Sequence, residues 1–511
     1  MKPESFFKIF FVSLIFTVFL TKQKVIPTPI NNQYDPVVVH TIFGTDKFYS
    51  KKNKFNMSLH LSPFYQHSSG ARDSKGKKVP EGDMLGRWNM FGLFYGQKVV
   101  TVVPVSCLAA SPSDKQFLLN QQNVYRGDVH DALVEVQDYI PTAETQGRDR
   151  YFNLSEAWRV LDNASEVQDP TADPTVYNYF DLDYIFTKED DFDLDIWDGW
   201  LPLTYVDYEK MGLRGQLNFD FGFGFGVNVK GGIVDYEQKP TFKQGTSIAD
   251  ASTPWSHTIN SIYEYLTKPE VIEAIANEVG LDVRGYHKTE LEDTHFEIYW
   301  NLPFKLKDDE GDLIATVIPY LSVGMWIPTG KKKDINKAFS LPTGNDDFWG
   351  VTFEGSINID FPSTIQIGFG GGAAFYESKN IKSYRVPSSI YQAGIYPWKA
   401  SIKKSPGAVW YVNASFKAEK FIEDFSFFFD YIHTEHIKDS IKMQETDSTR
   451  NQYFKPERLE EDSKWRANVI HSGLNYHVSP GLEMGISFQA PMSGARIYKT
   501  TTILGTISFN F

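Results

Sequence analysis

The sequence predicts an all-β fold, a transmembrane antiparallel up-and-down β-barrel of about 12 strands. Three observations predict it. Apolar and polar residues alternate in segments of about ten residues, short and long connections alternate along the chain, and no apolar run beyond the N-terminus reaches the roughly 20 residues of a membrane helix. Successive side chains of a strand point to opposite faces. Each alternating segment can therefore face lipid on one side and the barrel interior on the other.

The clearest alternation lies at the end of the chain, where apolar residues share one face of a strand. They are Ile503, Gly505, Ile507, Phe509 and Phe511. This segment resembles the final strand of bacterial outer-membrane β-barrels, which ends on an aromatic residue. The resemblance implies that Phe511, Phe509 and Ile507 form a signal that the barrel-assembly machinery reads, and that the protein resides in the bacterial cell outer membrane.

The same alternation recurs upstream and defines the other strands. The expected strands lie at about 53–66, 203–222, 227–233, 296–302, 313–325, 349–359, 365–375, 412–418, 425–431, 465–478, 482–490 and 502–511. Most of them approach the length of about ten residues that a tilted strand needs to cross a membrane. Their number is even, as single-chain bacterial barrels prefer.

The connections between these strands alternate strictly in length. Short ones are expected near residues 222, 306–311, 362, 421 and 479. Longer ones are expected at 67–202, 237–289, 328–347, 378–406 and 438–463, with a medium one at 491–499. Outer-membrane barrels sort their connections in this way, because turns gather on the periplasmic side and loops on the outside. A Greek-key sandwich has no reason to do so.

The segment 67–202 is too long for a bare loop. We expect it to be an acidic external loop or a plug within the barrel domain 53–511. An alternative places two further strands at 87–95 and 191–196, which gives fourteen strands and a large periplasmic insertion at about 97–180.

The N-terminus has the layout of a signal peptide. Lys2 and Lys8 precede an apolar run at 9–20, so residues 1–22 are expected to direct export, with the cleavage site left open. A membrane-anchoring helix is the alternative. Residues 23–52 form an N-terminal extension, and Cys107 as the only cysteine excludes an internal disulfide.

Composition limits the partners. The net charge of -13 argues against nucleic acid, because phosphate binding requires clustered Lys and Arg. The expected partners are outer-membrane lipids, the barrel-assembly machinery and small solutes, and a homo-oligomer is left open.

The candidate pore-lining residues are charged residues at strand positions whose side chains are expected to face the barrel interior. They are Arg214, Asp220, Lys230, Glu297, Glu354, Asp360, Lys417, Asp430 and Glu483. Carboxylates outnumber cations among them, and acidic rings favour cations. The sequence therefore predicts a porin-like channel for passive diffusion of small cationic or neutral solutes. Two alternatives remain: paired charges that close the lumen, and a surface-binding or adhesion protein that acts through its loops.

No catalytic constellation is evident in the sequence. His471 and Ser472 are neighbours on one strand and point to opposite faces, so they cannot act as base and nucleophile. We therefore expect no enzyme activity, no cofactor and no metal site.

Overall fold

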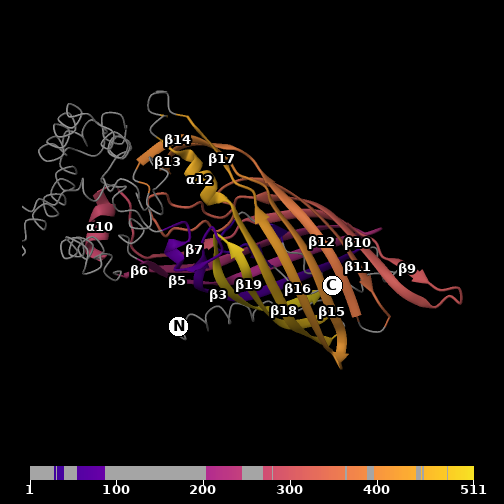
Figure 1. The fold of residues 1–511 in the computed structure, drawn as a ribbon. Helices are drawn as coiled ribbons and strands as arrows, with labels where there is room; N and C mark the ends of the chain where they lie inside the picture. The colour runs from indigo at the N-terminus through magenta and orange to yellow at the C-terminus, as the bar shows by residue number, and fades with distance from the viewer. Residues whose placement is uncertain are drawn as a thin grey trace, which may run out of the picture.

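The fold is a closed antiparallel β-barrel, as the sequence predicts (Figure 1). The computed structural model describes residues 28–29, 32–39, 55–86, 203–243, 269–278, 280–362, 365–387, 396, 398–444, 451, 454–479 and 481–511. The barrel strands within these residues are β3 (Asn56–Arg72), β5 (Leu203–Gly222), β6 (Phe225–Lys243), β8 (Thr294–Asn301), β10 (Leu313–Ile327), β11 (Gly350–Asp360), β12 (Ile365–Tyr376), β15 (Val409–Ile422), β16 (Phe425–His436), β18 (Trp465–Ser479), β19 (Leu482–Ala495) and β20 (Ile497–Asn510). The barrel closes because β20 pairs with β3 and β10 pairs with β11.

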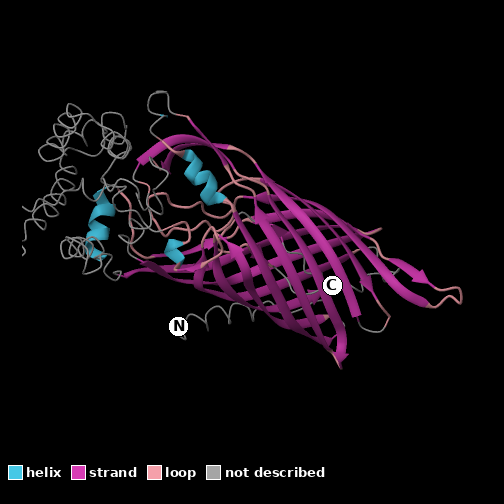
Figure 2. Cartoon of the chain, viewed as in Figure 1, coloured by secondary structure: helices cyan, strands magenta, loops and turns pink. Residues whose placement is uncertain are grey.

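The structure also has shorter strands and helices besides the twelve barrel strands (Figure 2). They are β1 (Thr28–Pro29), β2 (Val37–Val38), β4 (Lys78–Val79), η1 (Glu81–Asp83), α10 (Pro269–Glu278), β7 (Tyr286–Leu291), β9 (Phe304–Lys307), β13 (Lys379–Val386), β14 (Trp398–Ser405), β17 (Ser440–Met443) and α12 (Pro456–Ser463). Strands β13, β14 and β17 form a sheet of their own at the long-loop end. None of the helices in the described ranges is long and apolar enough to span a membrane.

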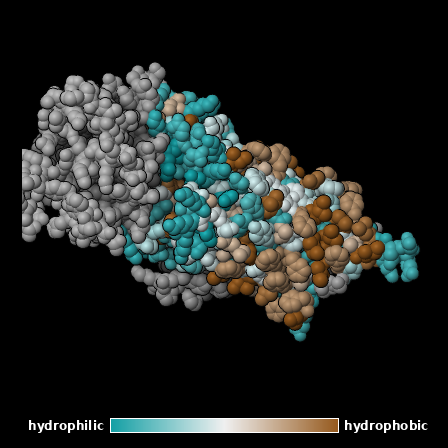
Figure 3. Space-filling view, viewed as in Figure 1, coloured by the Kyte–Doolittle hydropathy of each residue, from teal (hydrophilic) through white to brown (hydrophobic). Residues whose placement is uncertain are grey.

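The outer surface of the barrel is an apolar band. Ile298, Phe369 and Ile486 are 53%, 63% and 58% exposed, although they are large aliphatic or aromatic side chains. Figure 3 shows hydrophobic residues around the middle of the barrel and hydrophilic residues toward both ends. Lipid can solvate such a band, and closure of the ladder pairs the backbone groups that lipid cannot hydrogen-bond.

The alternative with fourteen strands is wrong. Strand β3 pairs directly with β5, from Asn56 opposite Asp220 to His67 opposite Glu209. A pair of extra strands between them has no place in this ladder. The segments 87–95 and 191–196 themselves lie outside the described residues.

The short and long connections are sorted to opposite ends of the barrel, with one departure from the prediction. The medium connection at 491–499 is only Arg496, with a φ of 50°. Pro491 hid the strand in the sequence, since proline cannot donate to a ladder. The register shifts at Val469 opposite Pro491, and this irregularity accommodates the proline within β19.

The chain terminus closes the seam of the barrel. The backbone N–H of Phe511 donates to the carbonyl of Met57 at 3.0 Å, and its ring is 46% exposed. Deletion of Phe511 is therefore expected to lower the yield of heat-modifiable, membrane-inserted protein, which gel mobility with and without boiling measures. A conservative Phe511→Tyr variant should insert normally. Unchanged insertion after the deletion would contradict an assembly role for this residue.

Candidate functional site in the barrel lumen

A short N-terminal hairpin lies inside the barrel. Strand β1 pairs with β2, with Thr28 opposite Val38. The turn between them is fixed by Asn32, whose Oδ1 accepts hydrogen bonds from the backbone N–H groups of Tyr34 and Asp35 at 2.9 and 3.3 Å. Val37, Val38 and Val39 are each at most 3% exposed. The N-terminal extension thus supplies a segment that occupies the lumen, which we call the plug hairpin (residues 28–29 and 32–39).

Four buried charges fix the plug hairpin to the wall. Asp35 Oδ2 lies 2.9 Å from Arg214 Nη2 and 3.2 Å from Lys210 Nζ, both on β5. Glu292, between β7 and β8, binds the same two cations, with Arg214 Nε at 2.8 Å and Lys210 Nζ at 2.9 Å. The quartet holds two carboxylates and two cations, so it is neutral as a whole. Removing one member of such a buried set is costly, because it leaves another charge without its partner.

The tip of the plug hairpin is also fixed at the mouth of the barrel. The side-chain amide of Gln33 donates to the carbonyl of Asp462 on α12 at 2.7 Å, and the backbone N–H of Tyr498 donates to the carbonyl of Gln33 at 3.2 Å. The rings of Tyr34 and Tyr498 meet edge to face with centroids 4.7 Å apart. Burial raises the pKa of Asp462, and Arg458 and Tyr396 only partly offset this effect. Loop elements therefore take part in holding the segment.

Beside the buried charges, an apolar cluster surrounds the valines of the plug hairpin. Val37 and Val39 pack in one buried cluster with inward side chains of many strands, including Phe64, Tyr208, Tyr236, Tyr411, Phe428, Ile432, Trp465, Val469, Ile497, Tyr498 and Leu504. Residues near the loop ends of their strands predominate in this cluster. The interior toward the long loops thus resembles the core of a soluble protein more than the lining of an aqueous channel.

Toward the short turns, the lumen is polar instead. His60 Nδ1 lies 2.7 Å from the Ser508 hydroxyl, and the Ser62 and Thr506 hydroxyls are 2.9 Å apart. All four side chains are at most 2% exposed. These side chains hydrogen-bond to one another between the paired strands β3 and β20.

The structure places the predicted pore-lining residues on the inner side, and none of them is more than half-exposed. Arg214, Lys230, Glu297, Glu354, Asp430 and Glu483 are buried, while Asp220, Asp360 and Lys417 are half-buried. Most of them contact oppositely charged or hydrogen-bonding neighbours. Lys230 Nζ lies 3.0 Å from Glu297 Oε2, and the Tyr320 hydroxyl donates to Glu297 at 2.5 Å.

The remaining contacts follow the same rule. Asp430 lies 3.3 Å from His471, Glu483 lies 2.5 Å from His477, Lys417 lies 2.7 Å from Glu419, and Asp220 accepts a hydrogen bond from Tyr299.

These contacts correct the expectation of an open, acidic pore. A ring of carboxylates selects cations only where its charge faces water and mobile ions. Here Glu297, Asp430 and Glu483 are at most 5% exposed and lie against Lys or His side chains. The interpretation in which opposite charges pair and close the lumen agrees with the structure. That these residues line a path for solutes stays a prediction.

The described residues also hold a cluster that superficially resembles a hydrolase triad. On the outer face, Asp235 lies 3.1 Å from His287 and accepts a 2.5 Å hydrogen bond from the Thr289 hydroxyl. In a catalytic triad the histidine stands between the nucleophile and the carboxylate. Here the carboxylate stands in the middle, so His287 cannot take the proton of Thr289. Within the described ranges, no three potential metal ligands come together.

Sequence reasoning missed the plug hairpin, Lys210 and Glu292. Parity identified Arg214 as inward, but its partners lie far away in the chain, in the N-terminal extension and between two strands. One signal was available: Asn31, Asn32, Asp35 and Pro36 form a turn-rich run just before three valines.

Comparisons with known proteins return weak structural similarities and no sequence match. No protein-family model and no curated protein sequence matches the chain. Among solved structures, it is similar to an outer-membrane channel from Pseudomonas putida F1, at 10% sequence identity and a TM-score of 0.36 over 60% of this chain and 86% of that one. It is also similar to a Pseudomonas aeruginosa FadL homologue, at 8% identity and a TM-score of 0.26 over 97% and 99% of the two chains. Similarities this weak carry no argument about function.

The barrel itself defines the class of protein. Its closed ladder, outer apolar band and sorted connections are the features of barrels that cross the bacterial outer membrane. The protein is a transmembrane β-barrel of this outer membrane, and its lumen holds an N-terminal segment.

Proposed function

We propose that the protein is a gated outer-membrane channel for small apolar or amphipathic molecules, with the plug hairpin as its gate. The observation that carries the proposal is the apolar cluster inside the lumen, into which the hairpin inserts Val37 and Val39. Channels for hydrophilic solutes have polar, water-filled interiors. Ligand sites for apolar molecules are instead lined by aliphatic and aromatic side chains with few polar groups.

The same cluster explains how a solute could open the channel. When the plug hairpin leaves, the apolar wall around Val37 and Val39 is exposed to water, at about 25 cal/mol for each Å². An apolar solute that fills the space removes this exposure. It therefore binds the open form more tightly than the closed form and shifts the equilibrium toward opening. A hydrated ion gains nothing from these walls.

The buried quartet gives the gate its closed state. Release of the hairpin takes Asp35 away from Arg214 and Lys210, so that among the described ion pairs Glu292 alone remains against two cations. This loss opposes opening until a solute compensates for it. The plug hairpin and its buried quartet both lie in the lumen, and this favours a transport role over the alternative of surface binding or adhesion.

Solute binding to the lumen is tested with neighbouring phenylalanines of opposite parity. Phe428 is 4% exposed and belongs to the lumen cluster, whereas Phe429 is 36% exposed on the outer face. Phe428→Ala is expected to weaken the binding of 1-naphthol at least about tenfold, a change of about 1.4 kcal/mol. Isothermal titration calorimetry of the purified protein in detergent measures the affinity.

Phe429→Ala is the matched control and should bind 1-naphthol as the wild type does. Glucose flux, measured by liposome swelling, should be negligible for the wild-type protein. Equal effects of the two substitutions, the absence of saturable 1-naphthol binding, or rapid glucose flux would each contradict the proposed function.

A further inference from the structure

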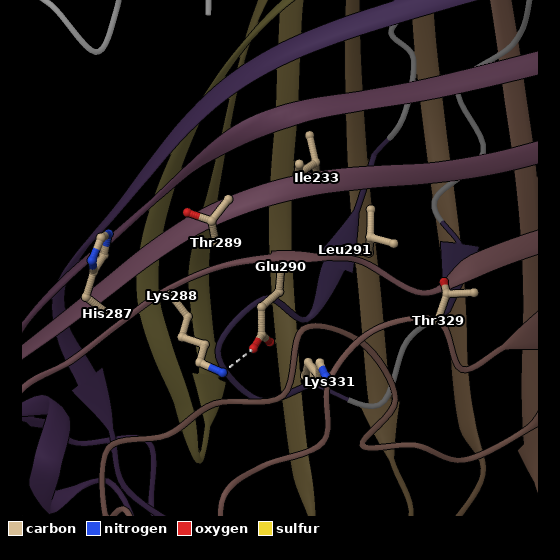
Figure 4. Close-up of a pocket in the computed structure, with 8 residues that line it drawn as sticks. All are labelled: Ile233, His287, Lys288, Thr289, Glu290, Leu291, Thr329 and Lys331. Carbon is tan, nitrogen blue, oxygen red and sulfur yellow. Dashed lines mark ion pairs between the residues drawn. The ribbon is translucent and has the colours of Figure 1, made fainter.

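A cavity of about 640 Å³ lies at an interruption of the barrel wall (Figure 4). Strand β7 pairs with β6 alone, and β10 pairs with β8 only as far as Ile327 opposite Thr294. Beyond this register, no described strand pairs with the second edge of β7. The cavity lies along this edge, with Thr329 and Lys331 of the following loop on its other side.

The boundary of the apolar band passes through the cavity. Ile233 and Leu291 stand opposite each other on the outer face and are 48% and 55% exposed. The next outward pair toward the loops is Asp235 with Thr289, which is polar and hydrogen-bonded. The apolar end of the cavity therefore meets the hydrocarbon, and its polar end lies at the level of the lipid headgroups.

The unpaired edge of β7 limits which chemical groups can occupy the cavity. Backbone N–H and C=O groups without partners are not tolerated in contact with hydrocarbon. An edge at headgroup level needs polar atoms to satisfy its donors. Phosphate oxygens can supply them, since oriented backbone N–H groups form anion-binding concavities.

The charges of the cavity also favour an anion. Lys288 Nζ lies 3.2 Å from Glu290, so these two side chains balance each other. Lys331 is exposed, and its ammonium forms no ion pair with the described carboxylates. Figure 4 shows Lys331 close to this Lys288–Glu290 pair. The side chains that line the cavity thus include two lysines and one carboxylate, and the Asp235 carboxylate beside them is held by His287 and Thr289.

We infer that this cavity binds the phosphate-bearing headgroup of a lipid in the surrounding membrane leaflet. Lys331 and Lys288 attract the phosphate, the open edge of β7 donates N–H groups to its oxygens, and an acyl chain lies on Ile233 and Leu291. Basic side chains near a membrane surface attract anionic lipids in this way. The inference is independent of the proposed channel function, because the site lies in the wall and not among the lumen cluster.

The test compares two lipids that differ only in phosphate. The full-length protein in nonionic detergent is mixed with monophosphoryl lipid A or with its dephosphorylated form, and native mass spectrometry counts the lipids retained. The wild type is expected to retain the phosphorylated lipid preferentially. Lys288→Gln together with Lys331→Gln should reduce this retention at least fivefold, while Lys331→Arg should preserve it.

The matched control is Lys305→Gln together with Lys307→Gln on β9, two exposed lysines at the opposite end of the barrel. It should retain the lipid as the wild type does. Hydrogen exchange gives a second readout, since the phosphorylated lipid should slow exchange of the β7 amides. Equal retention of both lipids, or no effect of the Lys288 and Lys331 substitutions, would overturn the inference. Full protection of the β7 amides without lipid would overturn it too, because a chain segment or strand-adding peptide would then cover the edge.

Discussion

Asp35→Asn is expected to open the barrel. The substitution removes one of two carboxylates that balance Arg214 and Lys210, whose side chains are at most 8% exposed. Removing one partner of a buried ion pair typically costs about 3–5 kcal/mol. Because about 1.4 kcal/mol corresponds to a factor of ten, the ratio of open to closed barrels should rise by a factor of about 100 to about 4,000. Planar-bilayer recordings of the purified protein measure the open fraction.

Two variants separate the gate from a general effect of charge. Asp35→Glu keeps the carboxylate and should stay closed. Asp424→Asn removes an exposed turn carboxylate that lies 3.1 Å from Lys420, and it should also stay closed. Opening can be seen independently by labelling a Val38→Cys variant in a Cys107→Ser background. Val38 is buried against Trp326, so thiol labelling should accelerate only when Asp35→Asn is added. A closed Asp35→Asn barrel with an unlabelled thiol would show that the hairpin is not the gate.

The barrel strands could be predicted because lipid and lumen impose different chemistry on alternating residues. In β12, Ile365, Ile367 and Phe369 face outward, and the residues between them, Gln366 and Gly368, face inward. This period of two is local, so the sequence shows it without any knowledge of partners. The same contrast fixes the register, since a slip by one residue would turn the apolar face into the lumen.

The contents of the lumen could not be predicted in the same way. The plug hairpin offers only two short strands, and the cations that hold it, Lys210 and Arg214, lie more than a hundred residues away in sequence. Glu292 lies between β7 and β8, where no alternation marks its direction. Parity indicates on which side of the wall Arg214 lies, but it does not indicate which carboxylates meet it. The sequence analysis counted more inward-facing Asp and Glu than Lys and Arg and therefore predicted a path for cations. The structure instead has these charges in ion pairs.

Arginine at Ile486 is expected to destabilise the barrel in a bilayer. Ile486 is 58% exposed on the outer face of β19, near the middle of its apolar residues. Placing a guanidinium at the bilayer midplane costs roughly 2–4 kcal/mol, and the penalty falls to about 0–1 kcal/mol near the interfaces. The free energy of unfolding in lipid vesicles, from guanidinium titration, measures the change. The conservative Ile486→Leu variant should be close to the wild type.

Two controls place arginine at a different depth in the membrane and on the inner side of the barrel wall. Ile422 is 60% exposed but ends β15 beside a turn, so Ile422→Arg should cost at most about 1 kcal/mol. Parity alone predicts that an inward arginine at Ser487 is tolerated. The structure changes this expectation, because Ser487 is 3% exposed and its hydroxyl lies 3.1 Å from His471. Ser487→Arg should therefore be destabilising through overpacking, in detergent as well as in lipid. Equal penalties at Ile486 and Ile422 would mean that the outer face does not contact a bilayer.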